Sequence, residues 1–273
     1  MSIDSLTVNS IQFDSLMTGV PPNPPDAYMI CLDDVVYASG IQRITLSIPI
    51  KKFDAVIGST LTDYATNIKN VSIRAQAILA SKYRDSNYDL TTLNSIGCYL
   101  SHISLWYKVI TDGLKGMYIF ESDAYCLSPL DTTEFLTTDG DILLFGSRLV
   151  GDSFFTPGNF GRTYGLTKVT QHFYGTHAYY ITYKGALKAL RYTFPIEAQI
   201  DAYLSYLTKL NMLNIYSYYP TVCNQSIHLS SLQTKPVKHY VDSILMATGI
   251  VFFFVIVIVV LIVVYLKKKK NEA

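Results

Sequence analysis

The sequence lacks an excess of charge of either sign. Its 22 basic and 21 acidic residues give a formal net charge of +1, and four of the basic residues are grouped at positions 267–270. The rest of the chain is therefore slightly acidic. Nucleic-acid-binding proteins usually present a basic patch or stripe, and this composition gives no sign of one. A disordered chain is excluded as well, because 49% of the residues are hydrophobic.

A secretory leader is also missing from the start of the sequence. The first basic residue is Arg43, and Asp4 and Asp14 lie where a leader would carry positive charge, so we expect no signal peptide. Cysteine is scarce, and four cysteines in 273 residues do not decide whether disulfides are present. The Asn-x-Ser triplets at Asn70 and Asn224 are equally uninformative, because such triplets often arise by chance.

One long uncharged run is present near the end of the chain. Residues 243–266 carry no charge, and as a helix they would extend about 36 Å, enough to cross a hydrocarbon core of about 30 Å. We therefore predict a linker over residues 231–242, a single transmembrane helix over residues 243–266 in the lipid bilayer, and a basic tail over residues 267–273. The positive-inside rule would put the body of the protein across the membrane from the tail, whereas the missing leader favours a cytosolic body. Of the two, we favour the cytosolic side.

The rest of the chain alternates apolar strands with amphipathic helices. Residues 1–26 have no sustained pattern and end in two Pro-Pro pairs, so they predict an N-terminal extension. Strands are predicted at residues 28–32, 43–48, 117–120, 141–146, 179–182 and 214–219, helices at 60–84, 96–114, 184–192 and 199–210, and a long loop at 151–175. This alternation predicts an α/β domain over residues 27–230, with a largely parallel sheet and helices on both faces.

The strand at residues 117–120 runs into Glu121, Ser122 and Asp123. Residues i and i+2 leave a strand on the same side, so the two carboxylates could converge on one point. They would repel each other unless a cation such as Mn²⁺ or Mg²⁺ lay between them, and such ions also bind diphosphates. In open α/β sheets, ligands bind beyond the carboxyl ends of the strands. The alternative is a solvated turn with two surface acids, and the triplet alone does not decide between them.

The residues before this triplet are more specific. The segment from Gly97 to Asp123 reads GCYLSHISLWYKVITDGLKGMYIFESD. It resembles glycosyltransferase family 25, which includes lipooligosaccharide and collagen galactosyltransferases, in a G-x-x-x-S-H-x-x-x-W helix followed by a strand that ends in an acidic triplet. Similar segments occur in the same order at residues 53–56, 175–181, 195–201 and 223–228. The resemblance covers residues 28–230.

The resemblance implies a GT-A type, Rossmann-like nucleotide-sugar-binding sheet. It also implies an inverting enzyme that transfers galactose or glucose from a UDP-sugar to a glycan, lipid-linked or glycoprotein acceptor, with Mn²⁺ or Mg²⁺ as helper ion. With the transmembrane segment, the chain would be a membrane-anchored hexosyltransferase. Three sets of site residues are implied: Asp201 as the catalytic base; Glu121, His102, Ser101, Gly175 and Thr176 for the nucleotide-sugar; and Asp123, Glu121 and His228 for the metal.

Structural alternatives stay open for these residues. Asp201 could be an acid favoured by a helix N-terminus, His102 a histidine buried inside a helix, and His228 a surface residue of a linker. The family's triplet usually has three acids, and Ser122 replaces the middle one. This departure leaves open a catalytically inactive relative that binds sugar or protein.

Hydrolases fit the sequence less well. A glycoside hydrolase needs two carboxylates several ångströms apart on opposite faces of a sugar, which two acids one residue apart match poorly. A nucleophilic serine hydrolase lacks its G-x-S-x-G turn. The sugar, the acceptor and the linkage are not determined by the sequence.

Overall fold

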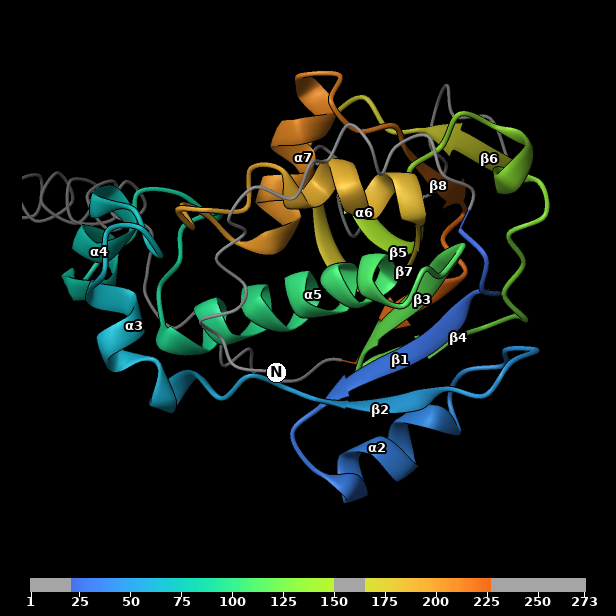
Figure 1. Ribbon diagram of the computed structural model, residues 1–273, viewed down its shortest axis with the longest axis horizontal. Coiled ribbons are helices and arrows are strands. Elements are labelled where there is room, and N and C mark those ends of the chain that lie inside the picture. The colour runs from blue at the N-terminus through green and yellow to red at the C-terminus, as the bar shows by residue number, and fades with distance from the viewer. Residues whose placement is uncertain (1–20, 150–164, 227–273) are drawn as a thin grey trace, which may run out of the picture.

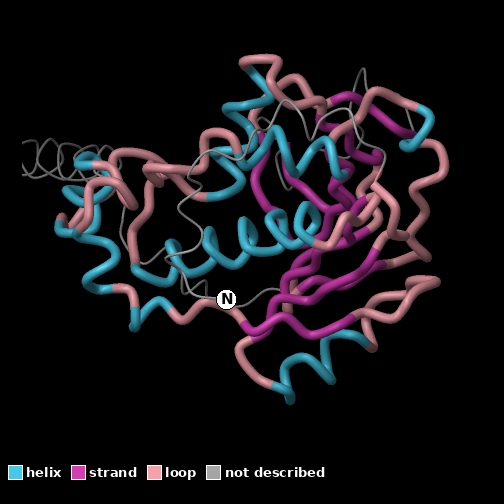
Figure 2. The backbone as a smooth tube through the Cα atoms, in the orientation of Figure 1, coloured by secondary structure: helices cyan, strands magenta, loops and turns pink. Residues whose placement is uncertain are grey.

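A mixed β-sheet organises the described part of the chain, which comprises residues 21–149 and 165–226 of the computed structural model (Figure 1). Its strand order is β2-β1-β3-β7-β5-β8-β6. The strands are β1 (Asp26–Cys31), β2 (Lys51–Asp54), β3 (Gly116–Glu121), β5 (Ile142–Leu149), β6 (Gly165–Lys168), β7 (Phe173–Thr182) and β8 (Ile215–Tyr219). Figure 2 shows these strands with helices packed around them.

Four of the six α-helices begin after a polar residue whose side chain caps them. They are α2 (Asp34–Ile41), α3 (Thr62–Thr66), α4 (Ile73–Ala80), α5 (Leu93–Thr111), α6 (Tyr183–Leu190) and α7 (Ile200–Lys209), with single 3₁₀ turns at η2 (Gly58–Thr60) and η3 (Phe135–Thr137). Side chains of Asp33, Ser72, Thr92 and Thr182 each accept a hydrogen bond from the first turn of α2, α4, α5 and α6. The longest helix, α5, ends before Gly113, whose φ of 61° lies in the left-handed region.

Two hydrophobic cores lie on opposite faces of the sheet. In β3, Met117 and Ile119 face the core that contains α5, α6 and α7, whereas Tyr118 and Phe120 face the second core, which α2 and η3 border. Figure 1 shows α5, α6 and α7 on one side of the strands and α2 on the other. The prediction of helices on both faces is therefore confirmed. Because β3 is buried on both faces, its apolar residues run without a break up to Glu121.

The prediction of a largely parallel sheet is wrong. β1–β2, β1–β3 and β5–β8 are parallel pairs, but β3–β7, β5–β7 and β6–β8 are antiparallel. The central strand β7 runs opposite to both of its neighbours. Between β5 and β7, the described residues 165–172 form strand β6 and no helix. Only parallel neighbours need a long crossover connection, so an antiparallel β7 does not require one.

Two predicted elements also differ from the structure. The alternating residues 43–48 form no regular strand. Ile44 is buried, and Leu46 and Ile48 pack against the same core, so the pattern reflects one-sided burial without a strand partner. The predicted helix over residues 60–84 is divided into η2, α3 and α4, because the backbone turns extended at Asn67 and α4 begins anew after Ser72.

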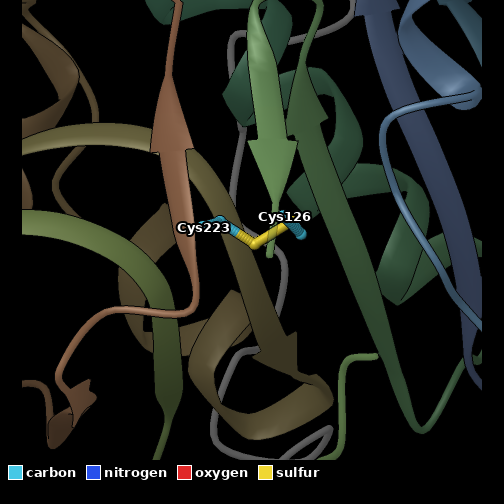
Figure 3. The surroundings of a disulfide bond; sticks show 2 residues. All are labelled: Cys126 and Cys223. Carbon is cyan, nitrogen blue, oxygen red and sulfur yellow. A yellow bond between two sulfur atoms is a disulfide. The ribbon is translucent and has the colours of Figure 1, made fainter. Parts of the chain in front are cut away.

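A second sheet of two short strands, β4 (Ala124–Cys126) and β9 (Cys223–Gln225), continues from the end of β3. A disulfide joins Cys126 to Cys223 across 97 residues of sequence (Figure 3), while Cys31 and Cys98 are free thiols. The sequence had left the disulfide question open. Disulfides are rare in the cytosol, so this bond does not favour the cytosolic location expected above.

The expected membrane anchor needs a correction. No helix among the described residues is long and apolar enough to cross a membrane. The transmembrane segment predicted at residues 243–266 lies outside the described residues, as do the basic tail and the whole of the linker. The structure therefore does not support the prediction of a single-pass membrane protein with the bilayer as a partner.

Candidate active site

Glu121, the last residue of β3, lies at the centre of the candidate site. Its Oε1 atom accepts a hydrogen bond of 3.0 Å from the Thr176 hydroxyl of β7 and lies 3.6 Å from Nε2 of His102 in α5. Burial alone would raise the pKa of Glu121, but the interactions with His102, His177 and Thr176 outweigh it and hold this pKa below its ordinary value. Glu121 is therefore a carboxylate that stays ionised at neutral pH.

A chain of buried polar groups orients His102. The indole N–H of Trp106 donates to the Tyr179 hydroxyl at 2.8 Å, and this hydroxyl lies 2.9 Å from Nδ1 of His102. Burial raises the pKa of Tyr179, so the phenol keeps its proton. Because the indole can only donate, the proton of Tyr179 is free to point at Nδ1. This network assigns the proton of a neutral His102 to Nε2, the nitrogen that faces Glu121.

The G-x-x-x-S-H-x-x-x-W motif contains two pairs of residues that are four positions apart. Each pair makes a specific contact in the structure, which explains the spacing of the motif. Ser101 donates to the carbonyl of Gly97 at 2.7 Å and accepts from the backbone N–H of Val56 at 2.9 Å. A Cβ on Gly97 would lie 2.4 Å from the Val56 carbonyl oxygen, so only glycine fits there. This pair fixes α5 to the segment after β2. The second pair, His102 and Trp106, holds the Tyr179 hydroxyl.

Asp201 lies in the first turn of α7. Its Oδ2 atom accepts a hydrogen bond of 3.1 Å from the backbone N–H of Gly175, and Oδ1 accepts one of 2.7 Å from Ala202. Burial raises the pKa of Asp201 and the negative charge of Glu121 adds to the increase, while the two backbone N–H groups reduce it. Asp201 is thus a more basic carboxylate than an ordinary aspartate.

Two consecutive residues of β7 connect the two carboxylates. Gly175 donates to Asp201, and the next residue, Thr176, donates to Glu121. Gly175 has a φ of 89°, a conformation that L-residues rarely adopt. Gly175 and Thr176 therefore hold the basic carboxylate of Asp201 and the ionised carboxylate of Glu121 from adjacent positions of one strand.

Asp123 follows β3 in a turn that the second sheet holds. Its Oδ2 accepts a hydrogen bond of 2.8 Å from the Gln225 side chain of β9. Arg43 donates to the carbonyl of Ser122 at 2.6 Å and to the Ser226 hydroxyl at 3.1 Å. The turn after Glu121 is thus connected to the chain segment near the disulfide.

The pKa of the free thiol of Cys98 is affected by the acidic residues of the site. Burial raises its pKa well above the ordinary value, and the negative charges of Glu121, Asp201 and Asp123 add to the increase in that order. Carboxylates from β3, from the turn after it and from α7 thus act on one side chain of α5. The structure brings together the predicted residues Glu121, His102, Thr176, Gly175 and Asp201, with Asp123 beyond them, while Ser101 binds Val56 instead.

His177 belongs to the same neighbourhood, and in the sequence it flanks the Gly-rich segment 151–175, a position from which it could touch donor or acceptor. It is 6% exposed, and neither ring nitrogen has a hydrogen-bond partner among the described residues. Burial lowers its pKa, and the negative charge of Glu121 partly offsets this. Side chains on Gly146 or Gly175 would approach its ring nitrogens to 2.1 and 3.0 Å.

A metal site is not assembled by the described residues alone, since no group of three potential ligands occurs among residues 21–149 and 165–226. Glu121 and Asp123 offer the carboxylate oxygens that Mn²⁺ or Mg²⁺ prefers. His228, the third predicted ligand, lies outside the described residues. Further ligands would have to come from residues outside the described part of the chain or from a bound diphosphate. Glu121 and Asp123 thus fit such an ion and supply part of its ligand set.

The fold is a mixed α/β sheet with helices, and the candidate site lies at the carboxyl end of β3, where this strand meets the antiparallel β7. A model of the family described as glycosyltransferase family 25 (LPS biosynthesis protein) matches residues 38–204, and the chain belongs to this family. The family supports glycosyltransferase activity, with a sugar donor and an acceptor as ligands. No curated protein matches the sequence.

Proposed function

We propose that the protein transfers galactose or glucose from a UDP-sugar to a hydroxyl group of a glycan, lipid-linked or glycoprotein acceptor. One observation carries the proposal: consecutive residues of β7, Gly175 and Thr176, hydrogen-bond to the basic carboxylate of Asp201 and to the ionised carboxylate of Glu121. A sugar transfer needs one group that accepts a proton and another that holds the donor. The family assignment supports the same reaction class.

In this reaction, Asp201 is the general base. As the acceptor oxygen attacks the anomeric carbon, its proton passes to Asp201, and the bond between that carbon and the diphosphate oxygen breaks. UDP leaves with the bonding electrons, and the anomeric configuration inverts. The raised pKa of Asp201 strengthens it as a base, because a carboxylate with a higher proton affinity accepts the proton more readily.

Glu121 holds the donor. Its ionised carboxylate accepts hydrogen bonds from hydroxyl groups, and Thr176 and His102 fix its orientation. Glu121 and Asp123 would also hold the Mn²⁺ or Mg²⁺ ion, with His228 as the further predicted ligand. When bound, such an ion supplies positive charge that stabilises the departing diphosphate.

The test uses the purified full-length chain and a panel of UDP-sugars, with UDP release measured in Mn²⁺ and in EDTA. We expect release from UDP-galactose or UDP-glucose, and Glu121→Gln should reduce it about tenfold or more because the charge-assisted hydrogen bonds to the donor weaken. Glu134→Gln, at an exposed glutamate before η3, is the matched control and should change nothing.

Two outcomes would contradict parts of this proposal. Full UDP release in EDTA would show that the reaction needs no metal ion, while the proposed transferase activity would stand. If the folded protein released no UDP from any donor, it would instead be an inactive relative that binds sugar or protein, in line with Ser122 in place of the usual middle acid.

A further inference from the structure

Three aromatic rings form a stack beside the candidate site. The ring of Tyr88, from the loop before α5, lies between those of His172 and Tyr174 at the start of β7. Ring centroids are 5.1 Å apart for Tyr88 and His172 and 5.3 Å apart for Tyr88 and Tyr174, with interplanar angles of 29° and 15°. All three side chains are half-buried, and neither tyrosine belongs to the two hydrophobic cores. The stack is therefore a partly open surface feature.

Two backbone connections tie this stack to Asp201. Gln199, which precedes α7, donates its backbone N–H to the carbonyl of Tyr88 at 2.9 Å. Its side-chain amide donates to the carbonyls of the residues on either side of Tyr88. On the other side of the stack, Tyr174 is followed by Gly175, whose N–H donates to Asp201. Both walls of the stack are thus fixed relative to the proposed base.

The polar edges of the rings share the environment of that base. Burial raises the pKa of Tyr88, and hydrogen bonding to Tyr174 and the negative charge of Asp201 raise it further. The Tyr88 phenol therefore keeps its proton and can donate a hydrogen bond near Asp201. Nδ1 of His172 is itself buried and has no hydrogen-bond partner among the described residues, and burial lowers the pKa of this histidine.

We propose that Tyr88, His172 and Tyr174 form the acceptor subsite, and that the acceptor is a carbohydrate whose sugar ring packs against this stack with a hydroxyl directed at Asp201. This inference rests on the proposed function. A pyranose has an apolar C–H face and a polar rim, which matches aromatic rings whose edges carry hydroxyl groups and a ring nitrogen. A serine or hydroxylysine side chain of a peptide would use only a small part of such a surface.

The kinetic test uses the full-length chain with p-nitrophenyl glycosides of galactose, glucose, mannose and N-acetylglucosamine as acceptors, and a serine-containing peptide as the non-sugar acceptor. Replacing Tyr88 or Tyr174 by leucine should raise the KM for the preferred glycoside about tenfold. The KM for the donor and UDP release without acceptor should stay within about twofold. Tyr88→Phe keeps the ring and should retain most of the acceptor affinity, and Tyr192→Leu, at an exposed tyrosine after α6, is the control.

A second measurement does not depend on turnover. Saturation-transfer NMR with the corresponding methyl glycosides should detect binding to the wild-type chain and lose it in Tyr88→Leu, with circular dichroism showing that the variant is folded. If no UDP-sugar reacts, the proposed function fails, while Tyr88-dependent glycoside binding would still support the subsite. Unchanged acceptor KM in the leucine variants, preference for the peptide, or no glycoside binding to wild type would each overturn the inference.

Discussion

Glu121 and Asp201 have opposite pKa shifts although neighbouring residues of one strand bind them. The pKa of Glu121 is lowered by its contacts with His102 and His177 despite burial, whereas burial and the charge of Glu121 raise that of Asp201. Two carboxylates in different environments can take different roles at one pH. The environment of each side chain, and not its chemical type, makes Asp201 the better base.

Replacing Asp201 by asparagine should therefore reduce kcat about 100-fold or more, because the amide cannot accept the proton. In the wild type, kcat/KM should fall as the pH drops through the pKa of Asp201. Because this pKa is raised, the fall should begin at a higher pH than for an ordinary aspartate of pKa 3.8. Initial rates of UDP release between pH 4 and pH 8 measure both effects.

Asp63→Asn is the matched control for this prediction, since Asp63 also lies in the first turn of a helix but is exposed. It should leave the rate and the pH profile unchanged. An Asp201→Asn enzyme that kept more than about a tenth of wild-type kcat would assign the base to another residue.

Tyr179 is a second residue whose importance depends on its hydrogen-bond partners. Tyr179→Phe leaves the indole N–H of Trp106 and Nδ1 of His102 without their common partner in a fully buried position. We expect the free energy of unfolding to fall by about 2–4 kcal/mol, measured by urea denaturation. Tyr118→Phe, which removes a buried hydroxyl with the single partner Thr132, should cost only about 1 kcal/mol. Equal losses in the two variants would contradict the two-partner role.

The sequence could predict part of this site and not the rest. The helical period placed His102 and Trp106 on one buried helix, and the resemblance supplied Glu121, Thr176, Gly175 and Asp201. The partner Tyr179, however, is 77 residues from His102, and no local pattern indicates such a contact. The contact of Ser101 was equally hard to predict, because its hydrogen bond with Val56 spans 45 residues. Its predicted role at the donor remains a prediction.

At the scale of elements, long periodic segments were the most predictable. The helix predicted at residues 96–114 is α5 at Leu93–Thr111, and those at 184–192 and 199–210 are α6 and α7 within two residues at either end. β7 was predicted to have four residues and has ten, because Gly175, with its φ of 89°, interrupts the apolar pattern. Strand partners, and hence the antiparallel direction of β7, depend on contacts that are distant in sequence.

The paired strands β4 and β9 give an element-scale prediction. Their disulfide closes a loop of about 97 residues, and replacing both Cys126 and Cys223 by serine should lower the free energy of unfolding by about 2–4 kcal/mol. Urea denaturation followed by circular dichroism measures the loss. A reductant should shift the wild-type midpoint toward that of the double variant and leave the variant unchanged. An unshifted wild-type midpoint would mean that the bond adds no stability.

At the scale of the whole molecule, the site forms where the sheet changes direction. β1, β2 and β3 run parallel, β7 runs opposite to them, and the side chains that meet at this junction come from α5, β3, β7 and α7. The family match over residues 38–204 contains α5, β3, β7 and the first half of α7 with Asp201, but it leaves out β1, β8 and β9. Cys223 and Gln225, which brace the turn at Asp123, thus lie beyond the matched region.

Because Cys126 and Cys223 are bonded, the strands β5, β6, β7 and β8 and the helices α6 and α7 lie within one covalent ring of the chain. A protease that cuts this ring once opens it without releasing a fragment. Limited trypsin digestion should therefore yield species that stay at full mass on a non-reducing gel and separate into two pieces after reduction. In the double serine variant, the pieces should separate under both conditions, and a wild-type chain cut once between Cys126 and Cys223 that separates without reductant would contradict the bond. The part of the chain that carries Asp201 would thus stay attached to the part that carries Glu121 even after the backbone between them has been cut.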